Sequence, residues 1–121
     1  MALLEREVDG VGAHVLAAAA GRSTREWLLR ARGWDDAAWD DGVSRLTGRG
    51  WLEDDGELSA EGLATVAGIE ADTDRLALAP WRALGDAGCD RLAQLLAPVR
   101  REVVAAGEWP DHNPIGAPDP E

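Results

Sequence analysis

The sequence predicts a mainly α-helical fold, in which one very short β-hairpin separates three short helices from two long ones. Apolar residues recur at steps of three and four within each helical run, and a serine or an aspartate stands before several of these runs. Glycine or proline follows the runs and divides the chain. The 121 residues are enough for one domain with its own hydrophobic core.

The first half of the chain holds the three short helices. Val11 and Val15 begin an apolar face that continues into a run of alanines and stops at Gly21. Ser23 opens a capping box for the second helix, and Asp35 caps the third. We therefore expect helices over about residues 11–20, 24–31 and 36–47.

The second half begins with a turn and continues into long helices. The turn signal Asp54-Asp55-Gly56 lies between two short alternating segments, which is typical of a β-hairpin. Ser59 then caps a helix, and Pro80-Trp81 breaks the chain. The two long helices are expected over residues 60–78 and 86–106.

This order of elements predicts a winged helix-turn-helix over about residues 22–62, within a domain of residues 1–106 that includes the flanking helices. Four of the six prolines fall after that domain. Residues 107–121 are therefore expected to form an extended Pro-rich tail.

Two short segments resemble MarR-type winged-helix regulators. Residues 44–52 read Ser-Arg-Leu-Thr-Gly-Arg-Gly-Trp-Leu and are similar to the end of the recognition helix in that family. Residues 56–62 read Gly-Glu-Leu-Ser-Ala-Glu-Gly and are similar to the step from the wing into the long dimerisation helix. The resemblance implies a winged fold, dimerisation through the long helices and a role in transcription regulation.

The whole chain more closely resembles the C-terminal part of an actinobacterial winged-helix family. Four segments carry this resemblance: Arg32-Gly33-Trp34, Arg49-Gly50-Trp51-Leu52, Ala79-Pro80-Trp81 and Asn113-Pro114-Ile115-Gly116, together with Trp39. Members of that family have a further N-terminal helical region. The resemblance therefore implies either a longer protein or a partner chain that supplies this region.

The charge distribution argues against nucleic acid as the partner. The chain carries 23 acidic and 12 basic residues, a net charge of −11. Residues 35–57, the expected DNA-reading helix and wing, hold eight carboxylates against only Arg45 and Arg49. DNA phosphates repel such a surface, and base reading needs side chains such as Arg, Lys, Asn or Gln. The alternative, a MarR-type regulator that does bind DNA, would use Arg22, Arg25 and Arg45.

Six tryptophans are present, whereas phenylalanine and tyrosine are absent. Trp34, Trp39 and Trp51 bracket the third expected helix, with Trp27 and Trp81 close to it in the predicted fold. Flat indole rings with one N–H donor suit a cleft for a small planar apolar ligand. The expected function is therefore that of a winged-helix protein that does not read DNA and binds such a ligand or a protein partner. Packing in the core is the other interpretation of these indoles, because each one buries a large apolar area.

His14 supports a third alternative, a small enzyme or an accessory protein of secondary metabolism. It lies near the apolar face of the first helix, beside the expected Trp-lined cavity, where an imidazole could act as a base or bind a ligand. A structural role is the competing interpretation. No spacing assigns a catalytic residue, and neither a metal-ligand pattern nor a Gly-rich phosphate loop is found. We expect no metal site and no cofactor.

The expected setting is the cytoplasm, and the expected partner is a second copy of the chain. Cys89 is the only cysteine, and no signal peptide or membrane-length apolar run is recognised. The two long helices carry more apolar surface than one small module covers. A homodimer through these helices would bury the following residues: Leu63, Val66, Ile69, Leu76, Leu92, Leu96, Val99 and Val103.

Overall fold

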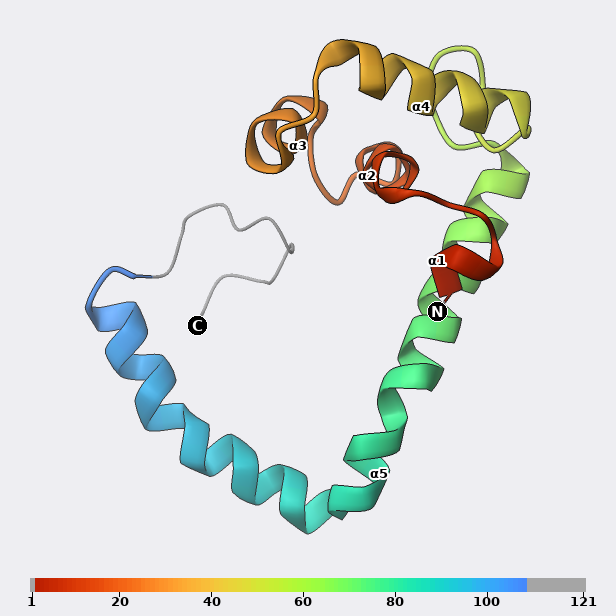
Figure 1. Ribbon diagram of the computed structural model, residues 1–121. Helices are drawn as coiled ribbons and strands as arrows, with labels where there is room; N and C mark the ends of the chain where they lie inside the picture. Colours follow the sequence, from red (N-terminus) through yellow and green to blue (C-terminus); the bar gives the residue numbers. More distant parts are fainter. Residues whose placement is uncertain (1, 109–121) are drawn as a thin grey trace. The chain divides into compact units, whose positions relative to one another are not determined.

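Residues 2–108, which the computed structural model describes, contain five helical segments (Figure 1). They are α1 (Ala2–Glu5), α2 (Gly10–Ala19), α3 (Arg25–Arg32), α4 (Asp36–Gly48) and α5 (Ala60–Ala105). The chain divides into two compact units, the first over residues 1–74 and the second from residue 75 onward. The expected tail lies outside the described residues from 109 onward, and the predicted domain boundary at residue 106 stays a prediction.

Side-chain caps set where the short helices begin. The carboxylates of Asp9 and Asp35 accept the backbone N–H of Gly12 at 2.7 Å and of Ala38 at 2.8 Å, which starts α2 and α4. The cap of α3 is Thr24 and not the expected Ser23, because the Thr24 hydroxyl accepts the N–H of Trp27 at 3.2 Å.

The first unit contains the hydrophobic core, in which α2 packs mainly against α4 (Figure 1). Gly42 of α4 permits this approach, since a Cβ atom there would lie 2.7 Å from Cγ1 of Val11. Leu28 of α3 is 2% exposed and closes the same core. The other buried members are Val8, Val15, Leu16, Trp39, Leu46, Trp51, Leu52 and Ile69.

The expected β-hairpin wing is wrong, because no strand forms among residues 2–108. Leu52 and Leu58 make one isolated antiparallel bridge, and the Glu53 N–H donates to the Glu57 carbonyl at 2.9 Å to close a turn. The segment is too short for a ladder of backbone hydrogen bonds between two strands. On one side the Trp51 N–H donates to the Leu46 carbonyl at the end of α4, and on the other side Ser59 caps α5. The first unit is therefore a helix-turn-helix with a tight acidic turn in place of a wing.

The joint between α4 and α5 is built around Ser59 and Gly62. The Ser59 hydroxyl donates to the Gly50 carbonyl at 2.6 Å and accepts the Gly62 N–H at 2.9 Å. The Ser59 N–H donates to the Trp51 carbonyl at 3.1 Å. A Cβ atom on Gly62 would lie 2.0 Å from that same carbonyl oxygen, so only glycine allows the first turn of α5 to sit here.

The second unit is helical and exposes much apolar surface. The helix runs through Pro80, so the expected break at Pro80-Trp81 is displaced to Gly85, whose φ of 69° and ψ of 167° are not helical. A glycine at positive φ ends a helix at little cost, and the chain re-enters a helix directly after it. Large apolar residues stay exposed along the unit: Leu76, Leu78, Trp81, Leu84, Leu95, Leu96, Val99, Val103 and Val104.

We predict that Gly62→Ala lowers the free energy of unfolding of the first unit by about 1–3 kcal/mol or more, because the new methyl group meets backbone that cannot move aside. Urea unfolding followed by tryptophan fluorescence measures this. The control is Gly48→Ala at the end of α4, where a Cβ atom meets nothing within 4 Å. The control should keep or slightly raise stability, and equal effects of the two changes would contradict the close contact at Gly62.

Candidate functional site

The outer face of α4 is acidic. Asp36 and Asp40 lie one turn apart and have side chains that are 75% and 74% exposed, and Asp41 is 67% exposed beside them. Trp39 points the other way, into the core. The exposed side chains at the start of the helix that a helix-turn-helix protein presents to DNA are therefore carboxylates.

Arg25, the nearest basic residue on α3, is held by this acidic face. Its guanidinium lies 2.6 Å from Asp36 and 3.6 Å from Asp40, and it also lies over the ring of Trp39 at 5.9 Å from the centroid. These contacts place the positive charge between two carboxylates of α4. The pair is largely exposed, so it contributes little to stability, but it fixes where the arginine lies.

Arg45, in the second half of α4, and Arg49, directly after α4, also make polar contacts within the first unit. Arg45 binds Asp41 on its own helix and Asp9, the cap of α2, at 2.7 Å. Arg49 donates to the backbone carbonyls of Arg6 at 2.8 Å and Glu7 at 3.3 Å, with its guanidinium stacked 3.8 Å from the ring centroid of Trp51. Arg45 therefore connects α4 to the start of α2, and Arg49 connects the end of α4 to the segment after α1.

Arg22, the third arginine expected at a DNA surface, lies elsewhere in the first unit. It follows α2, and its guanidinium lies 2.5 Å from the carboxylate of Glu70 on α5. Arg22, Arg25 and Arg45 are thus each paired with a carboxylate and are not gathered on one face. Residues 1–74 contain sixteen acidic and seven basic side chains, so no excess of positive charge compensates for these pairings.

The indoles expected to wall a cleft are distributed over different environments. Trp39 and Trp51 are 4% and 7% exposed and belong to the core. Trp27 is half-buried with the guanidinium of Arg30 lying 5.1 Å from its ring centroid, and Trp81 is half exposed in the second unit. Trp34 is half-buried and contacts His14.

His14 and Trp34 form a hydrogen-bonded pair between α2 and the turn before α4. The Trp34 Nε1–H donates to Nδ1 of His14 at 2.9 Å. Because an indole nitrogen can only donate, Nδ1 must be the unprotonated nitrogen of the imidazole. Burial, and after it the positive charge of Arg32, lower the pKa of His14. The imidazole is therefore held neutral, with a structural partner on one nitrogen.

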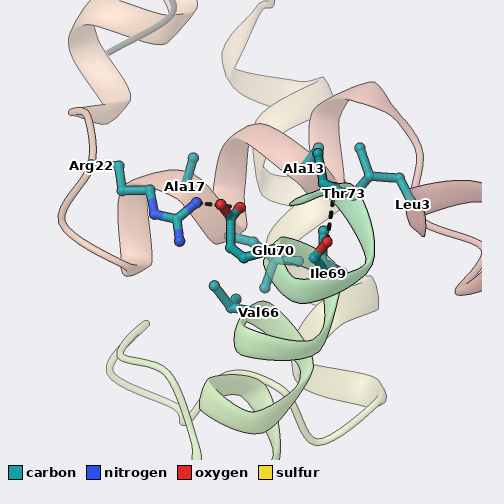
Figure 2. A pocket seen from close by; sticks show the side chains of 9 residues that line it. Leu3, Ala13, Ala17, Arg22, Val66, Ile69, Glu70 and Thr73 are labelled. Atoms are coloured by element: carbon teal, nitrogen blue, oxygen red, sulfur yellow. Dashed lines mark hydrogen bonds and ion pairs between the residues drawn. The ribbon is translucent and has the colours of Figure 1, made fainter. Parts of the chain in front are cut away.

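An apolar groove lies where α1, α2 and the start of α5 meet, and Figure 2 shows the side chains around it. Its volume is about 250 Å³. Its walls are mostly aliphatic, and the Arg22–Glu70 ion pair stands at its edge. The lining residues are Leu3, Ala13, Leu16, Ala17, Arg22, Val66, Ile69, Glu70 and Thr73.

Packing and polar contacts hold the groove in shape. Leu16 and Ile69 are buried members of the core and form its floor. The Thr73 hydroxyl donates to the Ile69 carbonyl at 2.8 Å, so it is directed toward its own helix. Arg6, which follows α1, binds Asp72 of α5 at 2.8 Å and keeps α1 beside α5. The walls are therefore largely formed before any ligand arrives.

Sequence reasoning missed this groove because its walls come from elements about fifty residues apart. Ala13 and Ala17 lie one turn apart on α2 and leave a shallow strip, and Val66 and Thr73 face it from α5. The signal that was available is that pair of alanines on the apolar face of a helix, where larger residues would fill the space.

A second hollow, of about 380 Å³, lies between the end of α2, α4 and the acidic turn. The ring of Trp39 forms part of one wall, and Asp55 and Glu57 form part of another. It is more open and more polar than the groove. Among the expected ligand-binding indoles, Trp39 alone lines either of these two spaces.

Residues 2–108 contain no group of three or more His, Cys, Asp or Glu side chains placed to hold a metal ion. In the same range, no helix has both the length and the apolar character needed to cross a membrane. Cys89 is half-buried, and its thiol lies 3.9 Å from the Trp81 carbonyl oxygen.

We predict that His14 makes stability depend on pH below neutrality. Its pKa is lowered in the folded chain, so the unfolded chain takes up the proton first as the pH falls. The stability that neutral His14 contributes is complete above the unfolded pKa of about 6.5 and is lost as the pH falls from there through the folded pKa. The urea midpoint should therefore decrease from pH 7.5 to pH 5.5.

The matched control for this experiment is His14→Asn, whose amide oxygen can still accept from Trp34 but does not titrate. In this variant the urea midpoint should decrease less between pH 7.5 and pH 5.5 than in the natural chain. An identical pH dependence in the variant and the natural chain would contradict the role assigned to His14.

Comparison with known proteins places this geometry in a family. Neither the curated proteins nor the solved structures that were compared with the chain gave a match. A helix-turn-helix family matches residues 1–110, which is most of the sequence and includes every element of the first unit. The three short helices α2, α3 and α4, with α2 packed against the other two, agree with that match. The chain therefore belongs to this helix-turn-helix family.

Proposed function

We propose that this chain is a helix-turn-helix regulator-type protein that binds a small apolar molecule in the groove between α1, α2 and α5, and that α4 does not read DNA. The observation that carries the proposal is the groove itself, about 250 Å³ of largely aliphatic space that opens beside one ion pair. Small-molecule sites typically combine apolar walls with a few polar groups that orient the ligand.

The edge of the groove also offers charged groups to a ligand. The Arg22 guanidinium and the Glu70 carboxylate are each about half exposed, so either can exchange its partner for a polar group on a ligand at small cost. An apolar body would lie along Ala13, Ala17 and Val66. The walls are largely aliphatic and contain none of the five indoles within residues 2–108, so the groove itself does not require a planar ligand.

Binding in this groove would act on the helix-turn-helix. Leu16 of α2 belongs to the core that α4 packs against, whereas Val66 and Ile69 belong to α5. A ligand that contacts α2 and α5 together favours whichever arrangement of these helices it fits best. This is the physical basis for a regulator that responds to a small molecule.

The charges of the first unit support the proposal that α4 does not read DNA. DNA-binding proteins gain most of their affinity by placing Lys and Arg against phosphates, with release of counterions. Here the exposed side chains at the start of α4 are carboxylates, and Arg25 and Arg45 are paired with them. At an effective dielectric near 20, two like charges 4 Å apart repel by roughly 4 kcal/mol before screening by salt.

DNA binding is the second candidate, and membership of a helix-turn-helix family favours it. It would require Arg22, Arg25 and Arg45 to leave their carboxylate partners for phosphates. The enzyme alternative with His14 as its site has less support, because one nitrogen of its imidazole already accepts a hydrogen bond from Trp34.

For the groove, we predict that the apolar fluorescent anion 8-anilinonaphthalene-1-sulfonate binds the natural chain saturably, and that Ala17→Leu reduces its affinity at least tenfold. The larger side chain fills the space between α2 and α5. Fluorescence titration measures the affinity, and circular dichroism checks the fold.

The matched control for the groove is Ala64→Leu, the same change at an exposed position of α5 that does not line the groove. It should leave the affinity unchanged. Equal affinities in the natural chain and both variants would show that the dye binds elsewhere and would contradict the groove as the site.

For DNA, we predict no binding of mixed-sequence duplex at low salt, about 50 mM, up to tens of micromolar protein, because like charges confront the phosphates. Fluorescence anisotropy of a labelled duplex measures it. Salt-dependent binding that is lost with Arg25→Gln, but kept with the control Arg82→Gln in the second unit, would favour the DNA-binding candidate and contradict this half of the proposal.

A further inference from the structure

The last part of α5 presents a row of apolar residues that the described part of the second unit leaves uncovered. Its members follow one another at alternating steps of three and four residues: Cys89, Leu92, Leu96, Val99, Val103 and Ala106. Ala106 lies just past α5, but its N–H still donates to the Glu102 carbonyl at 2.9 Å, so the helical turn includes it. We call these six residues the seam.

Spacing of this kind is the signature of helix-to-helix packing. A step of 3.5 residues on average keeps one narrow face of a helix directed at a partner helix. No charged residue occupies the seam, whereas Asp90, Arg91 and Arg101 lie outside it. Pro98 also lies outside the seam, so its missing N–H and its ring do not face the partner.

The seam is exposed where a partner would lie. Leu96 is 53% exposed, Val99 58% and Val103 38%, and Leu95 at the flank is 54% exposed. Cys89 and Leu92 are half-buried. Side chains this apolar are seldom left in water in a contiguous row unless something covers them.

The apolar area of the seam suits a pair of chains that associates reversibly. Leu95, Leu96, Val99 and Val103, with the half-buried Leu92, offer on the order of 400 Å² of accessible surface. This is about half of the ~800 Å² that each partner contributes to a standard interface, and polar side chains beside the seam add to it.

We propose that the seam is the interface of a symmetric homodimer, in which the last part of α5 packs antiparallel against the same segment of a second copy. In a symmetric antiparallel pair centred between Leu96 and Val99, Leu96 of each copy faces Val99 of the other. Leu92 then faces Val103, and Cys89 faces Ala106. A larger side chain meets a smaller one in each layer.

The side-chain volumes favour this direction over the parallel one. A parallel pair would place leucine on leucine at residues 92 and 96 but valine on valine at residues 99 and 103, so the inner layers would differ in volume. Helix pairs pack at a nearly constant distance of 8–10 Å and to high density, which layers of equal volume allow. The antiparallel pair combines one leucine with one valine in each of its four inner layers, with the smaller Cys89–Ala106 layers at its two ends.

Sedimentation equilibrium of the full chain between 1 and 200 µM tests the interface. The expected result is a concentration-dependent shift from the 12.9 kDa monomer to the dimer, with Val99→Glu weakening dimerisation at least tenfold. The control is Gln94→Glu, which adds the same charge at an exposed position outside the seam. A monomer throughout, or equal effects of the two substitutions, would overturn the proposal.

Crosslinking through Cys89, the single cysteine, distinguishes the antiparallel dimer from a parallel one. In the antiparallel dimer the two Cys89 residues are about 25 Å apart along the helices, since each residue adds about 1.5 Å, so mild oxidation should leave the natural chain uncrosslinked. Ala106→Cys should crosslink, because its new thiol faces Cys89 of the partner copy. Rapid crosslinking of the natural chain through Cys89 would overturn the antiparallel arrangement, and so would a dimer in which Ala106→Cys fails to crosslink.

Discussion

Asp9 is the point on which the arrangement of the first unit depends. One oxygen of its carboxylate accepts the Gly12 N–H at 2.7 Å and starts α2, and the other binds Arg45 of α4 at 2.7 Å. The ion pair is largely exposed and contributes at most about 1 kcal/mol. Asp9 matters for geometry, because it begins α2 and also joins α2 to α4, the helix whose Gly42 approaches Val11 closely in the core.

The same pairing has a functional consequence. The three arginines expected at a DNA surface hold helices together: Arg45 joins α4 to α2, Arg25 joins α3 to α4, and Arg22 joins the end of α2 to α5. The fold is that of a DNA-binding type of domain, but its surface at α4 is anionic. The aliphatic groove lies between α2 and α5 and is lined by no residue of α4. The fold and the side chains on the surface of α4 therefore favour different partners.

The local elements could be predicted from the sequence because their signals are local. Asp35 and Ser59 were identified as caps, and α4 and α5 begin at the residues directly after them. The wing was predicted wrongly because alternation and a turn signal indicate a hairpin without showing that Trp51 and Ser59 leave no backbone for a ladder. The helix break was placed at Pro80 although Gly85, at positive φ, provides it.

The candidate site could not be predicted in the same way, because tertiary contacts decide it. Composition does not distinguish an indole in a core from one in a cleft, and Trp39 and Trp51 lie in the core. The groove depends on Ala13 and Ala17 facing Val66 across about fifty residues of chain, and periodicity shows only that each residue faces inward. The acidic character of α4, in contrast, was readable directly from the sequence.

The central claim is that the first unit binds an apolar ligand in its groove and leaves the face of α4 free of nucleic acid. A backbone-amide NMR map of the full chain, recorded with 8-anilinonaphthalene-1-sulfonate and separately with duplex DNA, tests both parts in one experiment. The dye should shift the amides of Ala13, Ala17 and Val66, and DNA should leave those of α4 unchanged. DNA shifts centred on Asp36 and Asp40, with no dye shifts in the groove, would contradict it.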